Sequence, residues 1–433
     1  MSAARRTPAP HVLRRTIRLA LLACVSALAT AALVAWLNVR GEAAIDDMQA
    51  RPDRFSEQQV ERGAYLARAG NCAGCHTAPG APAYAGGKGI DTPFGTVYAG
   101  NLTPDAQTGL GSWTAAQFWR AMHHGRSKDG RLLYPAFPYA SYTLITRDDS
   151  DALYAYLGSL PPVVRANRPH DLRFPYGLQA SLAVWRALFF RPGQFVPDSQ
   201  QTADWNRGAY LVKGLGHCMA CHAPRNVFGA TIDGDALDGG SLALQGWHAP
   251  SLAAASEAGV ADWPLADIAG LLKSGTAPGG STLGPMADVV FRSTQYLDDA
   301  DLRAMAVFLK ALPQQRRPPQ PPAPADPGTL GLGERLYARH CAECHGAQGQ
   351  GRGPYPALAG QRTVTQHAPD NLLQVILAGG FAPTTPANPR PYGMPPFRQA
   401  LSDAEVAALA TYLRRSWGHN ASPVSELAVL RSR

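Results

Sequence analysis

The chain has 433 residues, of which 45% are hydrophobic and 17% charged, a balance that supports about three well-packed domains and excludes a largely disordered protein. The formal net charge is +8, but six of the 40 basic residues fall within residues 1–40, which contain no Asp or Glu. The rest of the chain carries 34 basic and 32 acidic residues and is nearly neutral, so its charge gives no support for nucleic-acid binding.

The first predicted element is a membrane-spanning helix at residues 19–39. This run is apolar except for Ser26, Thr30 and Asn38, and at about 1.5 Å per residue it would span roughly 31 Å, close to the hydrocarbon thickness of a bilayer. Five arginines precede it: Arg5, Arg6, Arg14, Arg15 and Arg18. Positive charge before the span favours a cytoplasmic N-terminus, so the remainder of the chain is expected on the other side of the membrane.

A cleaved signal peptide is the alternative for this end of the chain, with a cut near Ala43 or Ala44. The apolar run is longer than the ~7–15 residues of a usual signal-peptide core, and its Ala-rich centre would place the cut inside the run. We therefore expect residues 1–45 to form a cytoplasmic tail and an uncleaved membrane anchor.

After the anchor, one pattern occurs three times. Its centre is Cys-x-x-Cys-His, preceded by a short helical pattern with a Gly and an aromatic residue, such as RGAYLARAGN. Later in each copy comes a second helix with a polar or acidic start, near Asp148, Asp298 and Ser402, whose side chains suit helix N-termini. Apolar residues behind these starts recur at helical spacing, so one face packs inward. This self-similarity predicts a repeat architecture.

The predicted fold class is mainly α, with three tandem domains after one N-terminal transmembrane helix. The domains are expected at residues 56–161, 204–312 and 329–418. Residues 162–203 form a connector, and residues 419–433 form a tail. Between the second and third domains, residues 313–328 are rich enough in Pro to act as an extended, semi-rigid linker.

Six of the seven cysteines belong to the repeated motif, and the seventh, Cys24, lies in the predicted membrane span. On one helical turn, two cysteines offer their sulfurs on one side, and the neighbouring His offers a ring nitrogen, which suits a haem held by two thioether bonds and one iron ligand. A zinc site would need a fourth ligand, disulfides would not explain the His, and a thioredoxin-type site needs a βαβ setting. We predict three covalent c-type haems, attached at Cys72 and Cys75, Cys218 and Cys221, and Cys341 and Cys344, with His76, His222 and His345 on the iron atoms.

The second iron ligand is sought among the methionines, because Met/His ligation is common and raises the haem potential. Met286 and Met394 each stand on a predicted loop after a helix that ends in Gly, and such loops can cross the far side of a haem. We therefore expect Met286 to ligate the second haem and Met394 the third. A gap-filling core methionine is the alternative for each.

The first copy differs. The position that corresponds to Met286 and Met394, which we call the methionine slot, lies in YPAFPY. It is occupied by Phe137, which cannot bind iron. Met122 aligns with core positions of the other copies, so it would reach the iron only from a rotated helix. The first haem is then either left open or ligated by a neighbouring His, and of His123 and His124 we favour His123.

With these residues, the chain resembles the membrane-associated triheme cytochrome c subunits of bacterial periplasmic dehydrogenases, which serve alcohol, gluconate, fructose, sorbitol, and molybdenum-containing aldehyde and N-heterocycle dehydrogenases. The likeness runs from about Arg62 to Trp417 and includes segments outside the haem motif, among them TPFGTVYAGNLTPD, KDGRLLYPAFPYASYT and GPMADVVFRSTQYL. Many members read YPAMPY and end in an amphipathic membrane segment, whereas this chain has Phe137 and ends ASPVSELAVLRSR. These differences favour the molybdenum branch.

The resemblance implies electron transfer rather than substrate chemistry in this chain. Electrons would arrive from a separate catalytic subunit of the molybdopterin, flavin or PQQ type and leave to ubiquinone or a terminal oxidase. It also implies a place at the inner (cytoplasmic) membrane, with the haem domains in the periplasm. Two other classes stay open: a self-contained haem enzyme, such as a peroxidase or sulfur-compound dehydrogenase, and a cytochrome subunit of a terminal oxidase.

The connector contains one further predicted helix, in FPYGLQASLAVWRALFFRPGQF at residues 174–195. Its large apolar residues recur at helical spacing: Leu178, Leu182, Trp185, Leu188 and Phe189. We favour a role in packing the first domain against the second. The alternative is an interfacial surface that touches the membrane or the catalytic subunit.

Overall fold

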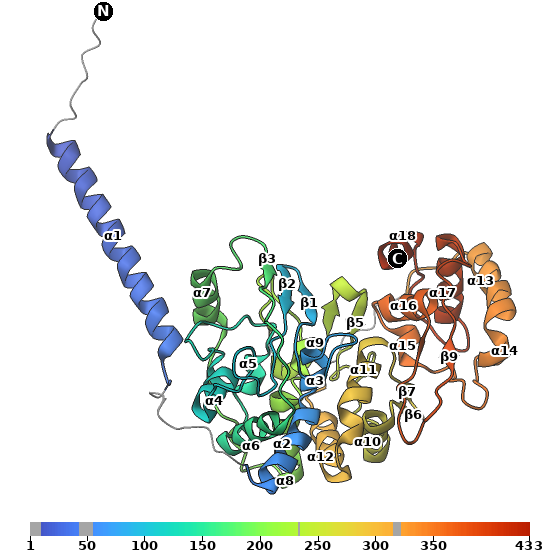
Figure 1. Cartoon of the computed structure of the whole chain (residues 1–433). Helices are drawn as coiled ribbons and strands as arrows, with labels where there is room; N and C mark the ends of the chain where they lie inside the picture. The colour runs from blue at the N-terminus through green and yellow to red at the C-terminus, as the bar shows by residue number, and fades with distance from the viewer. Residues whose placement is uncertain (1–9, 43–54, 233, 315–321) are drawn as a thin grey trace, which may run out of the picture.

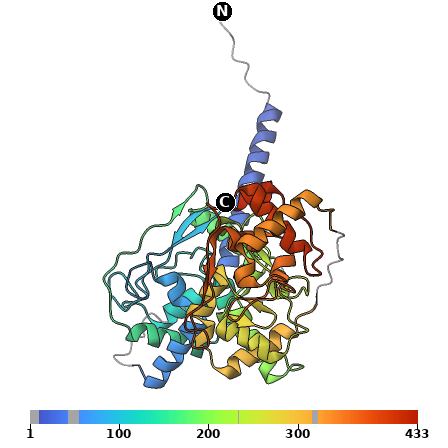
Figure 2. The same cartoon turned by 90° about the vertical axis from the view of Figure 1, so that its right-hand side faces the viewer.

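The computed structural model describes residues 10–42, 55–232, 234–314 and 322–433, so the alternative cleavage site near Ala43 and Ala44 lies outside the described residues. Helix α1 (Pro10–Val39) stands clear of a body of short helices and small sheets over most of its length (Figure 1 and Figure 2). Residues Arg14–Val39 of this helix are long and apolar enough to cross a membrane, in agreement with the predicted span.

The body contains three units, which we define by their first and last helices. These helices pack against each other in every unit. The first unit runs from α2 (Glu57–Ala69) to α6 (Arg147–Ser159), the second from α8 (Ala203–Ala209) to α12 (Asp299–Lys310), and the third from α13 (Pro327–His340) to α17 (Asp403–Arg415).

Shorter elements fill each unit. The first contains α3 (Cys72–His76), β1 (Gly89–Thr92), β2 (Gly95–Tyr98), α4 (Ala115–His124) and α5 (Tyr139–Tyr142). The second contains η1 (Tyr210–Leu215), α9 (Met219–His222), η2 (Gly234–Ala236), β4 (Gly240–Leu242), η3 (Ala243–Gln245), β5 (Trp247–Ala249), α10 (Leu265–Ser274), β6 (Thr276–Ala277), β7 (Gly280–Ser281), α11 (Gly284–Arg292) and η4 (Thr294–Tyr296). The third contains α14 (Ala342–His345), α15 (Arg362–Thr365), α16 (Asp370–Ala378), β8 (Gly380–Phe381) and β9 (Gly393–Met394).

A glycine makes the close crossing of the paired helices possible in each unit. A Cβ atom built on Gly63 would lie 1.9 Å from the carbonyl oxygen of Ala152, on the partner helix. The matching separations are 2.0 Å for Gly208 and 2.3 Å for Gly333. Any larger residue would force the helices apart, which explains why a Gly precedes the aromatic residue in all three copies of the sequence pattern.

The last helix of each pair begins with a side-chain cap, as predicted. Asp298 and Ser402 accept the backbone N–H of the residue three positions later and start α12 and α17. In α6 the cap is Thr146, so Asp148 lies in the first turn, where a negative charge still favours the helix N-terminus.

The connector and the tail are folded parts of the body. The connector contributes β3 (Asp171–Leu172), which pairs with β2 and completes the antiparallel sheet β1-β2-β3, and it also contains α7 (Gln179–Phe189). The tail forms α18 (Glu426–Ser432), which packs on α17 and buries Val429. Residues 315–321 of the predicted linker lie outside the described residues.

The first two units share one hydrophobic core. Leu66 and Leu153 of the first unit belong to the same buried cluster as Leu215 and Phe308 of the second. The third unit has a separate cluster, centred on residues such as Leu373, and lies at the end of the body away from α1 (Figure 1). Burial of apolar side chains is the main stabilising term, so the first two units should fold together and the third on its own core.

Two matching polar contacts join the first two units. Arg207 donates two hydrogen bonds to Asp301 in its own unit, and Tyr65 of the first unit donates a third at 2.6 Å. In the mirror arrangement, Arg62 bonds Asp149 in the first unit while Tyr210 of the second donates to Asp149, also at 2.6 Å. Tyr65 and Tyr210 are the aromatic residues of the two RGAYL segments, so the repeat in sequence becomes a reciprocal interface.

Asp301→Asn is expected to destabilise this interface by about 3 kcal/mol, because it leaves Arg207 without its ionic partner in a largely buried site. Burial raises the pKa of Asp301, but the bonds from Arg207 and Tyr65 outweigh it and hold the pKa below its usual value of 3.8. The carboxylate therefore stabilises the fold above about pH 4, and this contribution is lost as the pH falls through the lowered pKa. Urea unfolding at pH 7 and in acid measures both effects.

The matched control is Asp204→Asn, which breaks the exposed pair with Arg303 and should cost less than about 1 kcal/mol. Two results would contradict the ionic role of Asp301. One is an Asp301→Asn protein as stable as the wild type at pH 7, and the other is a variant that loses as much stability in acid as the wild type does.

Candidate haem-binding site

The three Cys-x-x-Cys-His segments occupy equivalent places in the fold. Each forms a short helix, α3, α9 or α14, directly after the first helical segment of its unit. In the first two units the residue before the first cysteine has a left-handed backbone, at φ 49° for Asn71 and φ 39° for His217, and this turn ends the preceding helix. The third motif follows α13 without such a residue, with Cys341 at φ −124°.

The motif histidines share one hydrogen-bond arrangement. The Nδ1 atom of His76 lies 2.7 Å from the carbonyl oxygen of Gly100. His222 and His345 have the same contact at 2.8 Å, to Pro250 and Pro356. A carbonyl acceptor fixes the proton on Nδ1 and leaves the lone pair of Nε2 free, and metal-binding histidines are usually held by such a bond. Burial lowers the pKa of His76 and His222, which favours the neutral, coordinating imidazole.

The motif cysteines are free thiols, and the first cysteine of each motif lies in an environment that disfavours thiolate. Burial raises the pKa of Cys72 and Cys218 to about 12 and that of Cys341 to about 11. A reactive dithiol or a thiolate metal site needs the opposite, a lowered pKa next to positive charge. Neutral sulfurs in apolar surroundings fit thioether attachment of a large apolar macrocycle, so the residues present fit haem c.

The two predicted methionine ligands are partly buried against the hydrophobic clusters of the body. Met394, at the end of β9, lies partly buried against the hydrophobic cluster that contains Cys341. Its backbone passes over the end of α16, where a Cβ on Gly379 would approach the carbonyl oxygen of Met394 to 2.2 Å. Met286 packs against the cluster that the first two units share, and Cys72 and Cys218 pack against the same cluster.

Met286 lies in the first turn of a helix rather than on the predicted loop. Pro285 occupies one of the first positions of α11, where its fixed φ and missing N–H favour helix initiation. The same helix contacts α3 of the first unit. The segment that carries Met286 therefore also forms part of the boundary between the first two units.

In the first unit, Met122 is buried in the shared hydrophobic cluster, and Phe137 and Cys72 pack against that cluster. His123 is buried elsewhere, with its ring stacked on Trp119 at 4.4 Å and its Nδ1 atom 3.5 Å from the hydroxyl of Thr143. None of these neighbours belongs to residues 72–76, so the described contacts do not connect His123 to the first motif.

The charged groups that act on His124 all lie outside residues 72–76. Burial, with the charges of neighbouring residues that include Arg186, lowers its pKa to about 4. A neutral imidazole is therefore expected at physiological pH.

Two features of the site were not predicted from the sequence. One is the set of backbone carbonyl groups that accept hydrogen bonds from the motif histidines, and the other is Tyr142. In each copy the carbonyl residue stands two positions before a Leu, in GNL, PSL and PAL, which is a weak signal that alignment of the copies would have revealed. Tyr142 is buried beside the first motif, and its hydroxyl lies 3.4 Å from the carbonyl oxygen of Gly70. Burial, with the nearby thiols of Cys72 and Cys75, raises its pKa well above the usual value, so the hydroxyl stays protonated.

The first and second motifs lie side by side across the shared core. The Nε2 atom of His217, next to Cys218, lies 3.3 Å from the carbonyl oxygen of Gly70, and its ring is 5.7 Å from that of Tyr142. The third unit docks on the second through polar contacts, including Arg362 with Asp262 at 2.7 Å. The chain thus places three equivalent motifs in one continuous body.

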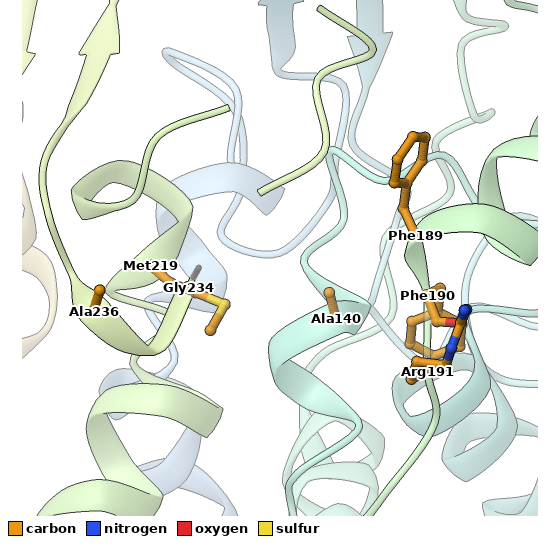
Figure 3. Close-up of a pocket in the computed structure, with 7 residues that line it drawn as sticks. All are labelled: Ala140, Phe189, Phe190, Arg191, Met219, Gly234 and Ala236. Atoms are coloured by element: carbon orange, nitrogen blue, oxygen red, sulfur yellow. The ribbon is translucent and has the colours of Figure 1, made fainter. Parts of the chain in front are cut away.

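A cavity of about 640 Å³ adjoins the second motif (Figure 3). Met219, between Cys218 and Cys221, lines one side, and residues at the end of α7 line the other. The full lining is Ala140, Phe189, Phe190, Arg191, Met219, Gly234 and Ala236. Its walls are mostly apolar, with one cationic side chain.

Comparison with known proteins gives a consistent set of similarities. The cytochrome c family model matches residues 60–161 and 331–417. The chain is 43% identical over 370 residues to a nicotinate dehydrogenase subunit of Pseudomonas putida, covering 83% of this chain but only 30% of that protein's length. It is 38% identical over 387 residues to the cytochrome c subunit of alcohol dehydrogenase (quinone) of Gluconacetobacter polyoxogenes, covering 84% and 81% of the two chains. It is 36% identical over 392 residues to the gluconate 2-dehydrogenase cytochrome c subunit of Pantoea cypripedii, covering 85% and 88%.

Proposed function

The chain belongs to the cytochrome c family, as a cytochrome c subunit of dehydrogenase complexes, and on that premise we propose that it carries three covalent haems in three tandem domains. The proposed domains are residues 56–161, 204–312 and 329–418. The observation that carries the proposal is the threefold recurrence of a motif His whose Nδ1 atom is bonded to a backbone carbonyl. Haem c supplies one-electron chemistry, so the proposed role is to conduct electrons.

The proposed residues follow from the motifs. The thioether attachments are Cys72 and Cys75, Cys218 and Cys221, and Cys341 and Cys344, and the proximal ligands are His76, His222 and His345. Met286 and Met394 are proposed as the second ligands in the second and third units. For the first unit we propose His123, since Phe137 holds the methionine slot.

His123→Ala is expected to change the absorption and EPR spectra of one haem and leave the other two as they are, because loss of a nitrogen ligand opens the sixth position of the iron. Adding Phe137→Met in that background should return the haem to six-coordination by placing a thioether in the slot. Unchanged spectra in His123→Ala would exclude His123 as a ligand, and Phe137→Met alone serves as the control.

The proposed partner is the catalytic subunit of a periplasmic dehydrogenase, of the molybdopterin, flavin or PQQ type. Identity to the nicotinate dehydrogenase subunit is 43%, against 38% and 36% for the cytochrome subunits of the alcohol and gluconate enzymes, which favours an N-heterocycle dehydrogenase of the molybdenum type. The chain spans 30% of the length of the nicotinate dehydrogenase relative, so the remainder of that protein has no counterpart in the match.

The proposed electron acceptor is ubiquinone in the inner membrane, with a terminal oxidase as the second candidate. The cavity beside Met219 supports the first choice, because its apolar walls and the side chain of Arg191 suit a lipophilic molecule with carbonyl groups. Helix α1 is proposed as the uncleaved anchor, with the haem domains in the periplasm.

Purification of the tagged full chain in mild detergent, followed by mass spectrometry, tests this function. We expect a cofactor-containing dehydrogenase to co-purify and its substrate to reduce the haems. A chain that comes alone, carries its haems and turns over hydrogen peroxide or thiosulfate by itself would overturn the proposal in favour of a self-contained haem enzyme.

A further inference from the structure

The outward face of α7 is apolar. Ala180, Val184 and Leu188 follow one another at four-residue spacing on the exposed side of the helix, and Val184 and Leu188 are 48% and 61% exposed. The helix has one charged residue, Arg186, which is turned inward and is only 3% exposed. A surface helix in water normally shows the reverse distribution, so this face is suited to an apolar environment.

Neighbouring segments extend this surface. Phe174 and Val227 are 86% and 85% exposed, in the turn before α7 and in the loop after the second motif. The Trp185 side chain ties that loop to α7 by donating a hydrogen bond of 2.9 Å to the carbonyl oxygen of Phe228. We define the α7 face as Phe174, Leu178, Val184, Leu188, Val227 and Phe228.

The end of α1 fixes the level of α7 relative to the proposed membrane. The Asn38 side chain donates a 2.9 Å hydrogen bond to the carbonyl oxygen of Ala183 in α7, and its Oδ1 atom accepts one of 2.9 Å from Arg186. Because Asn38 is the penultimate residue of α1, α7 lies beside the last turn of the membrane helix (Figure 1). Hydrocarbon gives way to the headgroup region at this level.

Ionic contacts hold the same junction. Glu42, just after α1, lies 3.6 Å from Arg126 and 3.9 Å from Arg120, with its side chain 13% exposed. Together with Asn38 and Arg186, these contacts tie the anchor to the first unit. The position of α7 beside the end of the span is therefore set by several directional contacts.

We infer that the α7 face rests on the surface of the bilayer, with its apolar side chains in the interfacial region. The inference depends on α1 being a membrane anchor, as proposed above. Continuity with the apolar surface of α1 favours lipid over a protein partner as the occupant. A helix with an apolar face and aromatic neighbours is the usual form of an interfacial contact. The same placement brings the cavity beside Phe189 close to the membrane surface.

Lipid photolabelling of the full chain in nanodiscs tests this placement. The probe is a phospholipid with a photoactivatable diazirine near the top of its acyl chain, and labelled peptides are mapped by mass spectrometry. We expect labelling of α1 and also of residues 174–189 and 227–228. Labelling of α1 without α7 would overturn the inference and leave the anchor intact, whereas the absence of label from both would refute the anchor itself.

Matched variants sharpen the test. Val184→Glu with Leu188→Glu should reduce labelling of α7 several-fold at unchanged haem absorbance, because both side chains are exposed and their replacement leaves the core intact. Leu430→Glu, at a residue of α18 that is 58% exposed, should leave α7 labelling unchanged. The opposite result is an α7 face that receives no lipid label and becomes protected from solvent when the catalytic subunit binds. That result would overturn the membrane assignment in favour of a protein contact.

Discussion

Replacing Cys341 and Cys344 together by alanine is expected to leave a chain with two covalent haems and to abolish most electron transfer through the complex. Thioether attachment needs both sulfurs of a motif, so the third unit should lose its haem. The third unit has its own hydrophobic cluster, and the first two units share another. The first two units should therefore stay folded and keep their haems. Haem content per chain and intact mass give the measurement.

Loss of the second motif is expected to have a wider effect than loss of the third. Cys218 packs into the core that the first two units share, and its neighbour His217 contacts Gly70 of the first unit. Cys218→Ala with Cys221→Ala should therefore disturb the first haem as well as removing the second, and lower the yield of folded protein. Each double variant removes one haem, so the effect on the two remaining haems shows whether a shared core links the units.

Cys24→Ala is the control for both variants. Cys24 lies exposed on α1, outside every motif, and its loss should leave three haems. A Cys341→Ala, Cys344→Ala protein that retains three haems would contradict the proposed attachment. Retention of wild-type electron transfer with two haems would instead place the third haem outside the electron path.

Local patterns in the sequence predicted much of the architecture. The helical spacing at residues 178–189 corresponds to α7 at Gln179–Phe189, and the apolar run at 19–39 lies within α1. The glycine that precedes each aromatic residue permits the close helix crossing in all three units. These features depend on residues close together in the chain, where period and side-chain size determine the outcome.

Contacts between residues far apart in the chain could not be predicted from the sequence. The hydrogen bond from Tyr65 to Asp301 joins residues 236 positions apart. Nothing in the local sequence indicates that the tyrosine of each repeated segment bonds a carboxylate of the other unit. The alignment of Phe137 with the methionine slot was visible, but the burial of His123 against Trp119 depends on how α4 turns in the packed unit. Helix rotation is set by tertiary packing, and a single sequence without distant contacts does not specify it.

Met394→Ala is expected to lower the reduction potential of the third haem and to remove the red charge-transfer band of a Met-ligated haem. Axial ligands set haem potentials over a range of about 0.8 V, and a thioether stabilises the reduced iron, so its loss should shift the potential by a substantial part of that range. Met394 sits on a short strand held over α16 by the close approach at Gly379, so truncation of its side chain leaves the backbone path in place. Redox titration of the three haems gives the measurement.

Met305→Leu is the matched control for this ligand assignment. Met305 is 4% exposed in α12, where it packs in the shared core, and a volume-conserving change should cost less than about 1.5 kcal/mol without altering any haem spectrum. Met286→Ala should act on the second haem as Met394→Ala acts on the third, although α11 also borders the first unit and its loss of packing is expected to lower stability. Three unchanged potentials in Met394→Ala would assign Met394 to packing, and the ligand of the third haem would then have to come from another residue of the third unit.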